Sequence, residues 1–404
     1  MTTGRPTGPE GDPTEDAHTH DQVNAASDPL GAEGDNAVGR EGPQGVRSQT
    51  TATVGTRGGA RGSGEGGSGR RRGGRRGGGR GGDRSMVPEA EFTSYYGRPI
   101  VKPSPWEADI PAYLFAGGLA AGSSLLAAGA DLTGRPVMRR SGRLVSIGAL
   151  GFSMVALVHD LGTPSRFYNM LRVAKPTSPM SMGTWILSGY GAFAGAATAA
   201  EVARMLPPRW GSAGPLRRPL ALLPYVDRPA GVLAAVIAPA VASYTAVLLS
   251  DTATPSWHSA YRELPFVFVG SAAAASSGMA MVTAPVAEAG PARRLAVAGA
   301  ALELVMEHRM EQTMGVTAEP LHHGTAGRLM RAAKALTVAG AAGSLLAGRS
   351  RVLSVLSGAA LLAGSACTRF GVFEAGQASA KDPKYTVVPQ RQRLEEHGPT
   401  RHPG

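Results

Sequence analysis

Eight apolar segments follow one another between residues 110 and 373, and they constrain the fold more than any other feature of the chain. Each is close to the ~20 residues that a helix needs to cross the hydrocarbon core of a bilayer. Because backbone groups in lipid must be hydrogen-bonded within their own segment, we predict an all-α, multi-pass membrane helix bundle of about eight transmembrane helices. The segments cover residues 110–130, 144–161, 181–203, 231–249, 265–286, 295–314, 330–346 and 352–373.

The sixth and seventh segments are the most polar of the eight. The sixth contains Glu303, Glu307, His308 and Arg309, and the seventh begins with Arg328, Arg331 and Lys334. Both segments could instead lie partly along the membrane interface.

Composition divides the chain into four parts. Residues 1–85 contain almost no large apolar side chain, so we expect a disordered tail, first acidic and then rich in arginine and glycine. Residues 86–109 are aromatic and proline-rich, which is typical of an interfacial segment. Residues 110–380 form the predicted transmembrane domain, and residues 381–404 form a polar C-terminal tail.

The Arg/Gly part of the tail has two interpretations. It either contacts RNA, anionic lipid or an acidic partner, or it is a solvated low-complexity extension. No aromatic residue is interleaved to stack on bases, so we do not expect nucleic acid as a partner. The net charge of +11 also suits a membrane protein with basic loops.

Insertion and orientation follow from the position of the charges. No apolar stretch precedes residue 110, so we expect the first membrane helix to act as its own insertion signal. The connections after the first and third segments carry most of the loop arginines, which predicts that these loops are cytoplasmic and that both termini lie outside. These arginines are Arg135, Arg139, Arg140, Arg143, Arg209, Arg217, Arg218 and Arg228.

The supply of soft metal ligands is small. A single cysteine, Cys367, excludes a four-cysteine iron–sulfur site, a structural zinc site and an internal disulfide. No two segments place histidines opposite each other as haem ligands would require. We therefore expect no haem, no iron–sulfur cluster and no other metal site in this chain, and we assign it no catalytic residue. In a redox process, electrons must pass to another subunit.

Polar residues at membrane depth are costly and therefore mark candidate functional positions. His159 and Asp160 close the second segment, and Arg166 follows. One interpretation is a helix end capped by Gly162 with Asp160 paired to Arg166; the other is a carboxylate and an imidazole beside a cavity. Tyr244, in the fourth segment, is either a structural tyrosine or a hydrogen-bond donor to a quinone carbonyl.

Acidic residues on the sixth segment also have two interpretations. Glu303 and Glu307 share one helix face, with Glu311 a turn further on. They form either a proton relay or a set of solvated carboxylates on a helix that surfaces early. We expect Asp131 and Glu201, at the ends of the first and third segments, to lie at the membrane interface.

Four motifs, in order, resemble the NrfD/polysulfide reductase membrane-subunit family, which occurs in complexes with molybdopterin enzymes and iron–sulfur proteins. The likeness covers about residues 92–385. The motifs are WE at 106–107 with PAYLFAGGLAAG at 111–122, DLGTPSRF at 160–167 with SPMSMGTW at 178–185, SYTAVLL at 243–249, and RFGVF at 369–373 with AG at 375–376 and DP at 382–383.

The resemblance implies an eight-helix subunit that binds a quinone, either menaquinone or ubiquinone, within its first four helices, near the face where an iron–sulfur partner docks. By position, Tyr244 would hydrogen-bond the quinone. The other positions implied at the pocket are His159, Asp160, Arg166, Tyr113, Gly117 and Gly118. The chain departs from the family at Thr163 and Ser165, where arginine and glutamate are common.

We therefore expect a membrane anchor and quinone-binding subunit in the bacterial cytoplasmic membrane, in contact with lipid. It would pass electrons between a ferredoxin-like iron–sulfur subunit and the quinone pool. By resemblance, the catalytic partner would be a molybdopterin subunit of the formate dehydrogenase type. The alternatives are an ion-translocating or transporter protein without redox chemistry, which would use Glu303 and Glu307, and an adaptor whose active part is the Arg/Gly tail.

Overall fold

The computed structural model describes residues 99–161, 163–207 and 217–397. The predicted disordered tail, most of the interfacial segment and the last residues of the C-terminal tail lie outside these ranges. The described residues form helices, turns and loops, with no strand among them. The all-α prediction is confirmed for this part of the chain.

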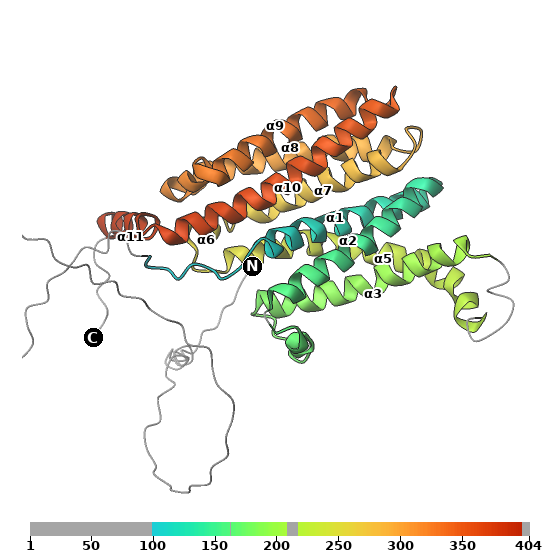
Figure 1. Ribbon diagram of the computed structural model, residues 1–404, viewed down its shortest axis with the longest axis horizontal. Helices are drawn as coiled ribbons and strands as arrows, with labels where there is room; N and C mark the ends of the chain where they lie inside the picture. Colours follow the sequence, from blue (N-terminus) through green and yellow to red (C-terminus); the bar gives the residue numbers. More distant parts are fainter. Residues whose placement is uncertain (1–98, 162, 208–216, 398–404) are drawn as a thin grey trace, which may run out of the picture. The chain divides into compact units, whose positions relative to one another are not determined.

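Eight long helices hold the eight predicted segments (Figure 1). They are α1 (Asp109–Leu132), α2 (Pro136–Asp160), α3 (Pro179–Met205), α5 (Arg217–Ser250), α7 (Leu264–Thr283), α8 (Gly290–Thr313), α9 (Gly324–Leu346) and α10 (Arg351–Lys381). Shorter helices connect or follow them: η1 (Pro164–Leu171), α6 (Pro255–Ser259), η2 (Gly315–Leu321) and α11 (Lys384–His397).

Three helices extend furthest beyond the segments that the sequence pattern predicts. Helix α2 begins at Pro136 rather than residue 144, and α5 begins at Arg217 rather than residue 231. Both extensions are rich in arginine, which a hydropathy pattern assigns to loops. Proline suits the first turn of a helix, where its missing N–H has no partner to lose, so Pro136 is a favourable start for α2. Helix α10 likewise continues to Lys381 instead of ending at residue 373.

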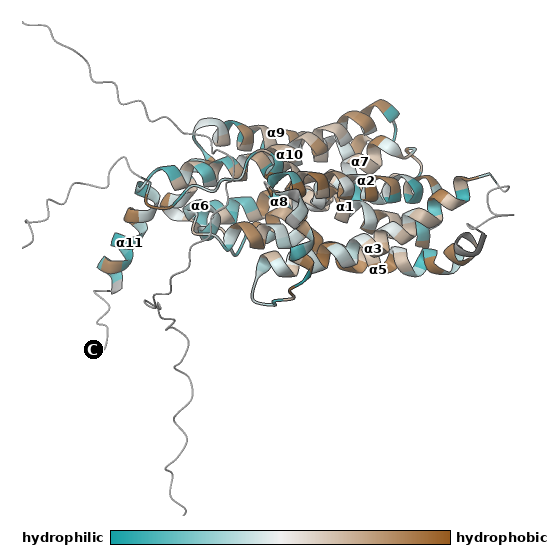
Figure 2. Ribbon diagram, turned by 60° about the horizontal axis from the view of Figure 1, so that its bottom comes forward, coloured by the Kyte–Doolittle hydropathy of each residue, from teal (hydrophilic) through white to brown (hydrophobic). Residues whose placement is uncertain are grey.

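The long helices differ in how well they suit a bilayer. Helices α1, α2, α5, α7 and α10 are long and apolar enough to cross a membrane. Helices α3, α8 and α9 are less apolar and do not meet the same criterion. Of these, α8 and α9 correspond to the two most polar predicted segments. Figure 2 shows apolar stretches along the long helices, with more hydrophilic residues toward their ends.

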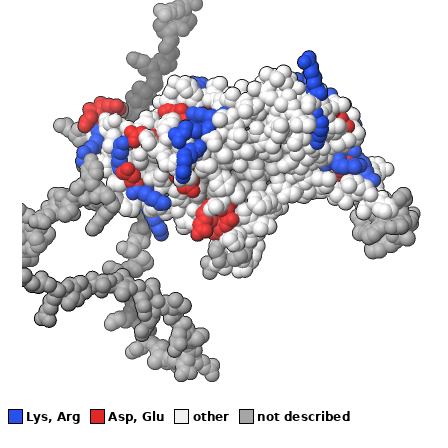
Figure 3. Space-filling view, turned by 45° about the horizontal axis from the view of Figure 1, so that its top comes forward, with Lys and Arg blue, Asp and Glu red and all other residues white. Residues whose placement is uncertain are grey.

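The bundle exposes large apolar side chains and buries polar ones. Phe152, Val155 and Val236 are exposed on the outer faces of α2 and α5, whereas Ser146 and Thr368 are buried between helices. Charged side chains gather toward the two ends of the face in Figure 3, and its middle carries few of them. An apolar belt of this kind suits contact with lipid chains, and the chain is a membrane protein.

The helices form two groups of four. In the first group α1 packs on α2 and α5, and α3 packs on α5 and α2; in the second, α7 packs on α8 and α10, and α9 packs on α10 and α8. The groups meet where α7 contacts α1 and α5, and where α10 contacts α1 (Figure 1).

Small residues bring α1 and α7 together. A Cβ atom added at Gly118 would lie 3.1 Å from the Cβ of Ala272, and one added at Gly122 would overlap the Ser276 side chain. The two glycines are four residues apart, so they lie on the same face of α1. This is the spacing of small residues that lets membrane helices approach closely.

Buried ion pairs join α2, α3 and α5 at one end of the first group. The Glu201 carboxylate, 1% exposed, accepts hydrogen bonds from Arg139 (2.9 Å), Arg143 (3.2 Å) and Arg204 (3.1 Å). Asp227 of α5 pairs with Arg143 and Arg204. Buried charges need partners of opposite sign. Glu201 therefore connects α3 to the arginines of α2, and Asp227 connects α5 to both of these helices.

We predict that Glu201→Gln destabilises the bundle. The change leaves Arg143 and Arg139 with one carboxylate fewer in a buried site. We expect the free energy of unfolding to fall by about 3 kcal/mol. This is the low end of the range for a broken buried pair, because Arg139 and Arg204 are partly exposed. The thermal midpoint of the detergent-purified protein measures this loss. Glu374→Gln, on an exposed position of α10, is the matched control. Equal midpoints for the two variants would contradict the structural role of Glu201.

Candidate functional site

Two of the residues implied by the resemblance meet inside the first helix group. Tyr113 lies near the start of α1 and Tyr244 near the end of α5, and their hydroxyl groups form a hydrogen bond. Both side chains are buried, with exposed fractions of 3% and 9%. The pairing arises because α1 starts at the end of the bundle where α5 finishes.

The tyrosine pair has hydrogen-bonding capacity left over. Each phenol carries one O–H donor, and the bond between them uses only one of the two protons. Among the described residues, neither hydroxyl has another hydrogen-bond partner. One O–H therefore remains free to donate to a third group.

A cavity with mostly apolar walls adjoins the pair. Thr184 and Ser188 also line it, but their hydroxyls donate to carbonyls of their own helix at 2.9 and 2.8 Å. Of the side-chain hydroxyls that line the cavity, those of the tyrosine pair therefore supply the O–H group that is still free to donate a hydrogen bond. The remaining lining residues are Met154, Leu157, Phe167, Met170, Met180, Gly183, Leu187 and Leu248.

The cavity is narrow. Its volume is about 40 Å³, which is room for about one water molecule. A flat aromatic ring would need the walls to move. Met154, Met170 and Met180 supply flexible, unbranched side chains that can rearrange.

Gly183 makes room for the Tyr244 ring. A Cβ atom at position 183 would lie 2.5 Å from Cε2 and 2.6 Å from Cδ2 of Tyr244. The ring therefore lies directly against the backbone of α3. Sequence reasoning included Gly183 within a family motif but did not assign it this function; the signal was a glycine in the second turn of a helix that begins with proline.

The last two residues of α2 do not line this cavity, although Leu157 and Met154 of the same helix do. His159 is 79% exposed, and its Nδ1 is 2.6 Å from Oδ2 of Asp109 at the start of α1. His159 and Asp160 are not among the described residues that line the cavity. Helix η1, which follows, supplies Phe167 and Met170 to the wall. The side chain of Arg166 lies outside the described residues, so its predicted pairing with Asp160 stays a prediction.

Gly117 and Gly118 lie about one turn further along α1 than Tyr113. A Cβ atom at Gly117 would contact the Ser153 hydroxyl of α2 at 3.6 Å, whereas Gly118 faces α7. Neither is among the residues that line the cavity. They contact α2 and α7 instead of the cavity.

Glu303 and Glu307 are buried in the second helix group, each 1% exposed. Thr368 Oγ1 donates to Glu303 Oε1 at 2.7 Å, while Glu303 Oε2 has no partner among the described residues. Lys334 Nζ lies 3.5 Å from Glu307 Oε1, an ion pair without a hydrogen bond, and 2.8 Å from Glu311 Oε1. Both carboxylates thus lie between helices rather than in solvent.

Arg369 lies between the two helix groups, where sequence reasoning assigned no function. Its guanidinium carbon is 3.6 Å from the centre of the Phe268 ring, and Nη2 donates to the Phe268 carbonyl at 2.7 Å. Nε and Nη1 have no partner within the described part of the chain. A Cβ atom at Gly118 would lie 3.3 Å from Nη2. Arg369 therefore contacts α1 from the group that contains Glu303.

In the described ranges, no three His, Cys, Asp or Glu side chains gather in a way that could hold a metal ion. The chemistry that the site offers is hydrogen-bond donation by phenols within apolar walls. A planar acceptor such as a quinone carbonyl fits this donor set.

Comparison with known proteins places this site in a family. The family model described as "Polysulphide reductase, NrfD" matches residues 100–301, which is half of the chain and includes Tyr113, Gly183 and Tyr244. No curated protein matches the chain. With this match over the helices that build the tyrosine pair and its cavity, the chain belongs to the polysulphide reductase NrfD family, the membrane subunits of redox complexes.

Proposed function

We propose that this chain is the membrane anchor and quinone-binding subunit of a multi-subunit oxidoreductase. It passes electrons between an iron–sulfur subunit and the quinone pool of the bacterial cytoplasmic membrane. The observation that carries the proposal is the buried Tyr113–Tyr244 pair, which keeps one O–H free beside an apolar cavity. Menaquinone and ubiquinone both present a flat ring with two carbonyl acceptors, which suits this lining.

The residues of the chain bind and orient the ring. The free phenol O–H donates to one carbonyl, and the second tyrosine holds the first in place through its own hydrogen bond. The methionine and leucine walls exclude water, which strengthens that hydrogen bond. Each two-electron reduction of a quinone takes up two protons, so the site also needs a proton supply.

The partners follow from the family and from the position of the site. Family members assemble with iron–sulfur and molybdopterin subunits, and we propose the same here, with a formate dehydrogenase-type catalytic subunit. The tyrosine pair lies at the end of the bundle that carries the short helices: α6, η2 and α11 contact one another there, and η1 contacts α2 and α3. These short helices offer a docking face for a ferredoxin-like subunit near the quinone.

We propose that Glu303 and Glu307 form a proton path in the second helix group. Arg369 contacts α1 at Gly118 and attracts the Glu303 carboxylate electrostatically, and Lys334 pairs with both Glu307 and the partly exposed Glu311. Charged groups thus follow one another from the contact with α1 at Gly118 to the partly exposed Glu311 of α8. The unpartnered Glu303 oxygen also suits the second candidate function, ion translocation without redox chemistry.

We predict that Tyr244→Phe weakens quinone binding about 3- to 10-fold, because one hydrogen bond contributes about 0.5–1.5 kcal/mol. Quinone extracted per protein after mild-detergent purification measures the loss. Tyr168→Phe, which removes an exposed hydroxyl of η1, is the control. Purification of the chain without quinone or an iron–sulfur subunit would overturn the redox proposal in favour of ion translocation.

Gly183→Ala should deplete quinone even though every hydroxyl is kept. The added methyl group displaces the Tyr244 ring and with it the donor. Gly189→Ala on the same helix has no neighbour within 4 Å of the new methyl group and should retain quinone. Equal quinone content in the two alanine variants would argue against Tyr244 as a quinone ligand.

Glu303→Gln should slow proton uptake without lowering quinone content. The amide cannot carry a proton, but its oxygen can still accept the Thr368 hydrogen bond, so the fold is kept. The complex in liposomes, with a pH dye and quinone reduction followed together, separates the two effects. Glu374→Gln serves as the control; if Glu303→Gln matches it in proton uptake, the path does not run through Glu303.

A further inference from the structure

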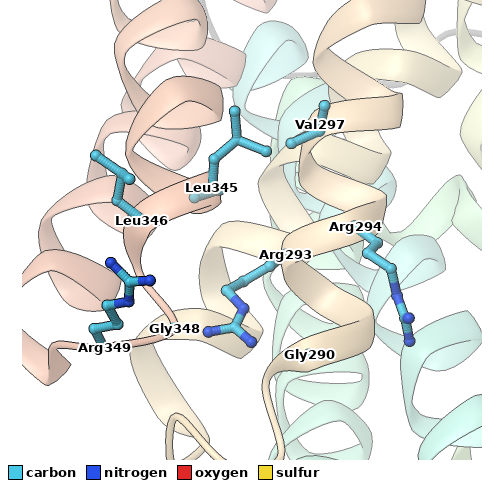
Figure 4. Close-up of a pocket in the computed structure, with 9 residues that line it drawn as sticks. Gly290, Arg293, Arg294, Val297, Leu345, Leu346, Gly348 and Arg349 are labelled. Atoms are coloured by element: carbon cyan, nitrogen blue, oxygen red, sulfur yellow. The ribbon is translucent and has the colours of Figure 1, made fainter.

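A second and larger cavity lies in the second helix group, at the end of the bundle opposite to the tyrosine pair. It has a volume of about 650 Å³ and opens between the first turns of α8 and the loop that joins α9 to α10 (Figure 4). Three arginines line it, Arg293, Arg294 and Arg349, and no carboxylate does. Nothing in the proposed quinone chemistry uses this cavity.

Two of the arginines face each other across the opening. Arg293 extends from α8 and Arg349 from the α9–α10 loop, whereas Arg294 points away to the side (Figure 4). The Nη1 atom of Arg293 is buried and has no hydrogen-bond partner among the described residues. Two facing guanidinium groups repel each other, and a buried unpartnered N–H is costly. A bound anion would remove both penalties.

The backbone around Arg293 is shaped to admit its guanidinium group. A Cβ atom at Gly348 would overlap that group, lying 3.0 Å from its central carbon. Glycine at this position lets the loop pass directly beside the arginine tip. Arg351, which follows the cavity residue Arg349 in the chain, does have partners: it donates to the carbonyl groups of Met281 and Ala284 at the end of α7.

The other side of the cavity is apolar and exposed. Leu345 and Leu346 are 72% and 63% exposed, and Leu345 points toward Val297 of α8, about one turn deeper than the arginines (Figure 4). Exposed leucines beside a basic opening match an amphiphile rather than a free ion. The helix ends also place the arginines where a membrane helix meets the headgroup layer.

We propose that this cavity binds an anionic glycerophospholipid. The phosphate group lies between Arg293 and Arg349, since guanidinium groups bind phosphate oxygens in pairs of parallel hydrogen bonds. An acyl chain covers Leu345 and Val297 along the outer face of α8 and α9. The inference is independent of the quinone proposal, because it uses no residue of the tyrosine pair or of the buried carboxylate cluster.

The test is native mass spectrometry of the delipidated, detergent-purified complex with added lipid. We expect phosphatidylglycerol to bind the wild type and to bind the double variant Arg293→Gln/Arg349→Gln at least about 10-fold more weakly, as loss of two charge-assisted hydrogen bonds implies. Arg309→Gln/Arg328→Gln removes the same charge from the far ends of α8 and α9 and should bind phosphatidylglycerol as the wild type does. Equal weakening in both double variants would show a general charge effect and overturn the site.

Further arms separate a lipid from a free phosphate. Phosphatidylcholine, whose choline cation offsets the phosphate charge, should bind the wild type more weakly than phosphatidylglycerol and should lose less affinity in the Arg293→Gln/Arg349→Gln variant. Inorganic phosphate and glycerol phosphate should bind far more weakly than phosphatidylglycerol. Leu345→Gln, a substitution at an exposed position, should weaken phosphatidylglycerol binding but not glycerol phosphate binding. Inorganic phosphate that binds as tightly as the lipid, or phosphatidylglycerol binding unaffected by both the arginine and the Leu345 variants, would overturn the assignment.

Discussion

The close approach of α1 to α7 is the contact on which the rest of the bundle depends. Gly118 and Gly122 leave no space for side chains between these helices, so the two four-helix groups share one interior. Helix α1 also packs on α2, α5 and α10. With α1 held at the centre, Tyr113 comes against Tyr244 of α5 on one side, and Arg369 of α10 comes against the backbone at Gly118 on the other.

Because the exterior is apolar, the polar groups of this protein find their partners inside it. The first group holds the tyrosine pair, the hydroxyl cluster of Ser124, Ser146 and Tyr190, and the ion pairs of Glu201. The second holds the carboxylates of Glu303 and Glu307. An unpaired polar group costs more in a low-dielectric interior than in water, so these sites restrict how the helices pack. Glu303, Arg369 and Arg293 are among the described residues with buried polar atoms that stay unpartnered, and the proposed proton path and lipid site are built on them.

The two ends of the bundle suit different partners. At one end the phenol pair, the cavity beside it and the short helices η1, α6, η2 and α11 favour a quinone and a docked electron carrier. At the other, arginines surround the helix ends of both groups: in the first they pair with Glu201 and Asp227, and in the second Arg293 pairs with no carboxylate of the described residues. Similar charges thus stabilise the fold in one group and offer an anion site in the other.

The sequence by itself determined the helix number, the membrane location and the family, because lipid demands long apolar segments and the family motifs are local in the chain. It pointed to Tyr113 and Tyr244 only through the family resemblance. It misplaced the start of α2, because arginines that resemble loop residues pair there with buried Glu201 and Asp227. It misplaced the start of α5 for a similar reason, since Arg228 pairs there with Asp131. Only the tertiary structure decided that Tyr113 contacts Tyr244, that Gly183 admits the Tyr244 ring and that Arg293 faces Arg349. Those contacts join helices far apart in the chain, and helix packing, which hydropathy does not encode, sets which faces meet.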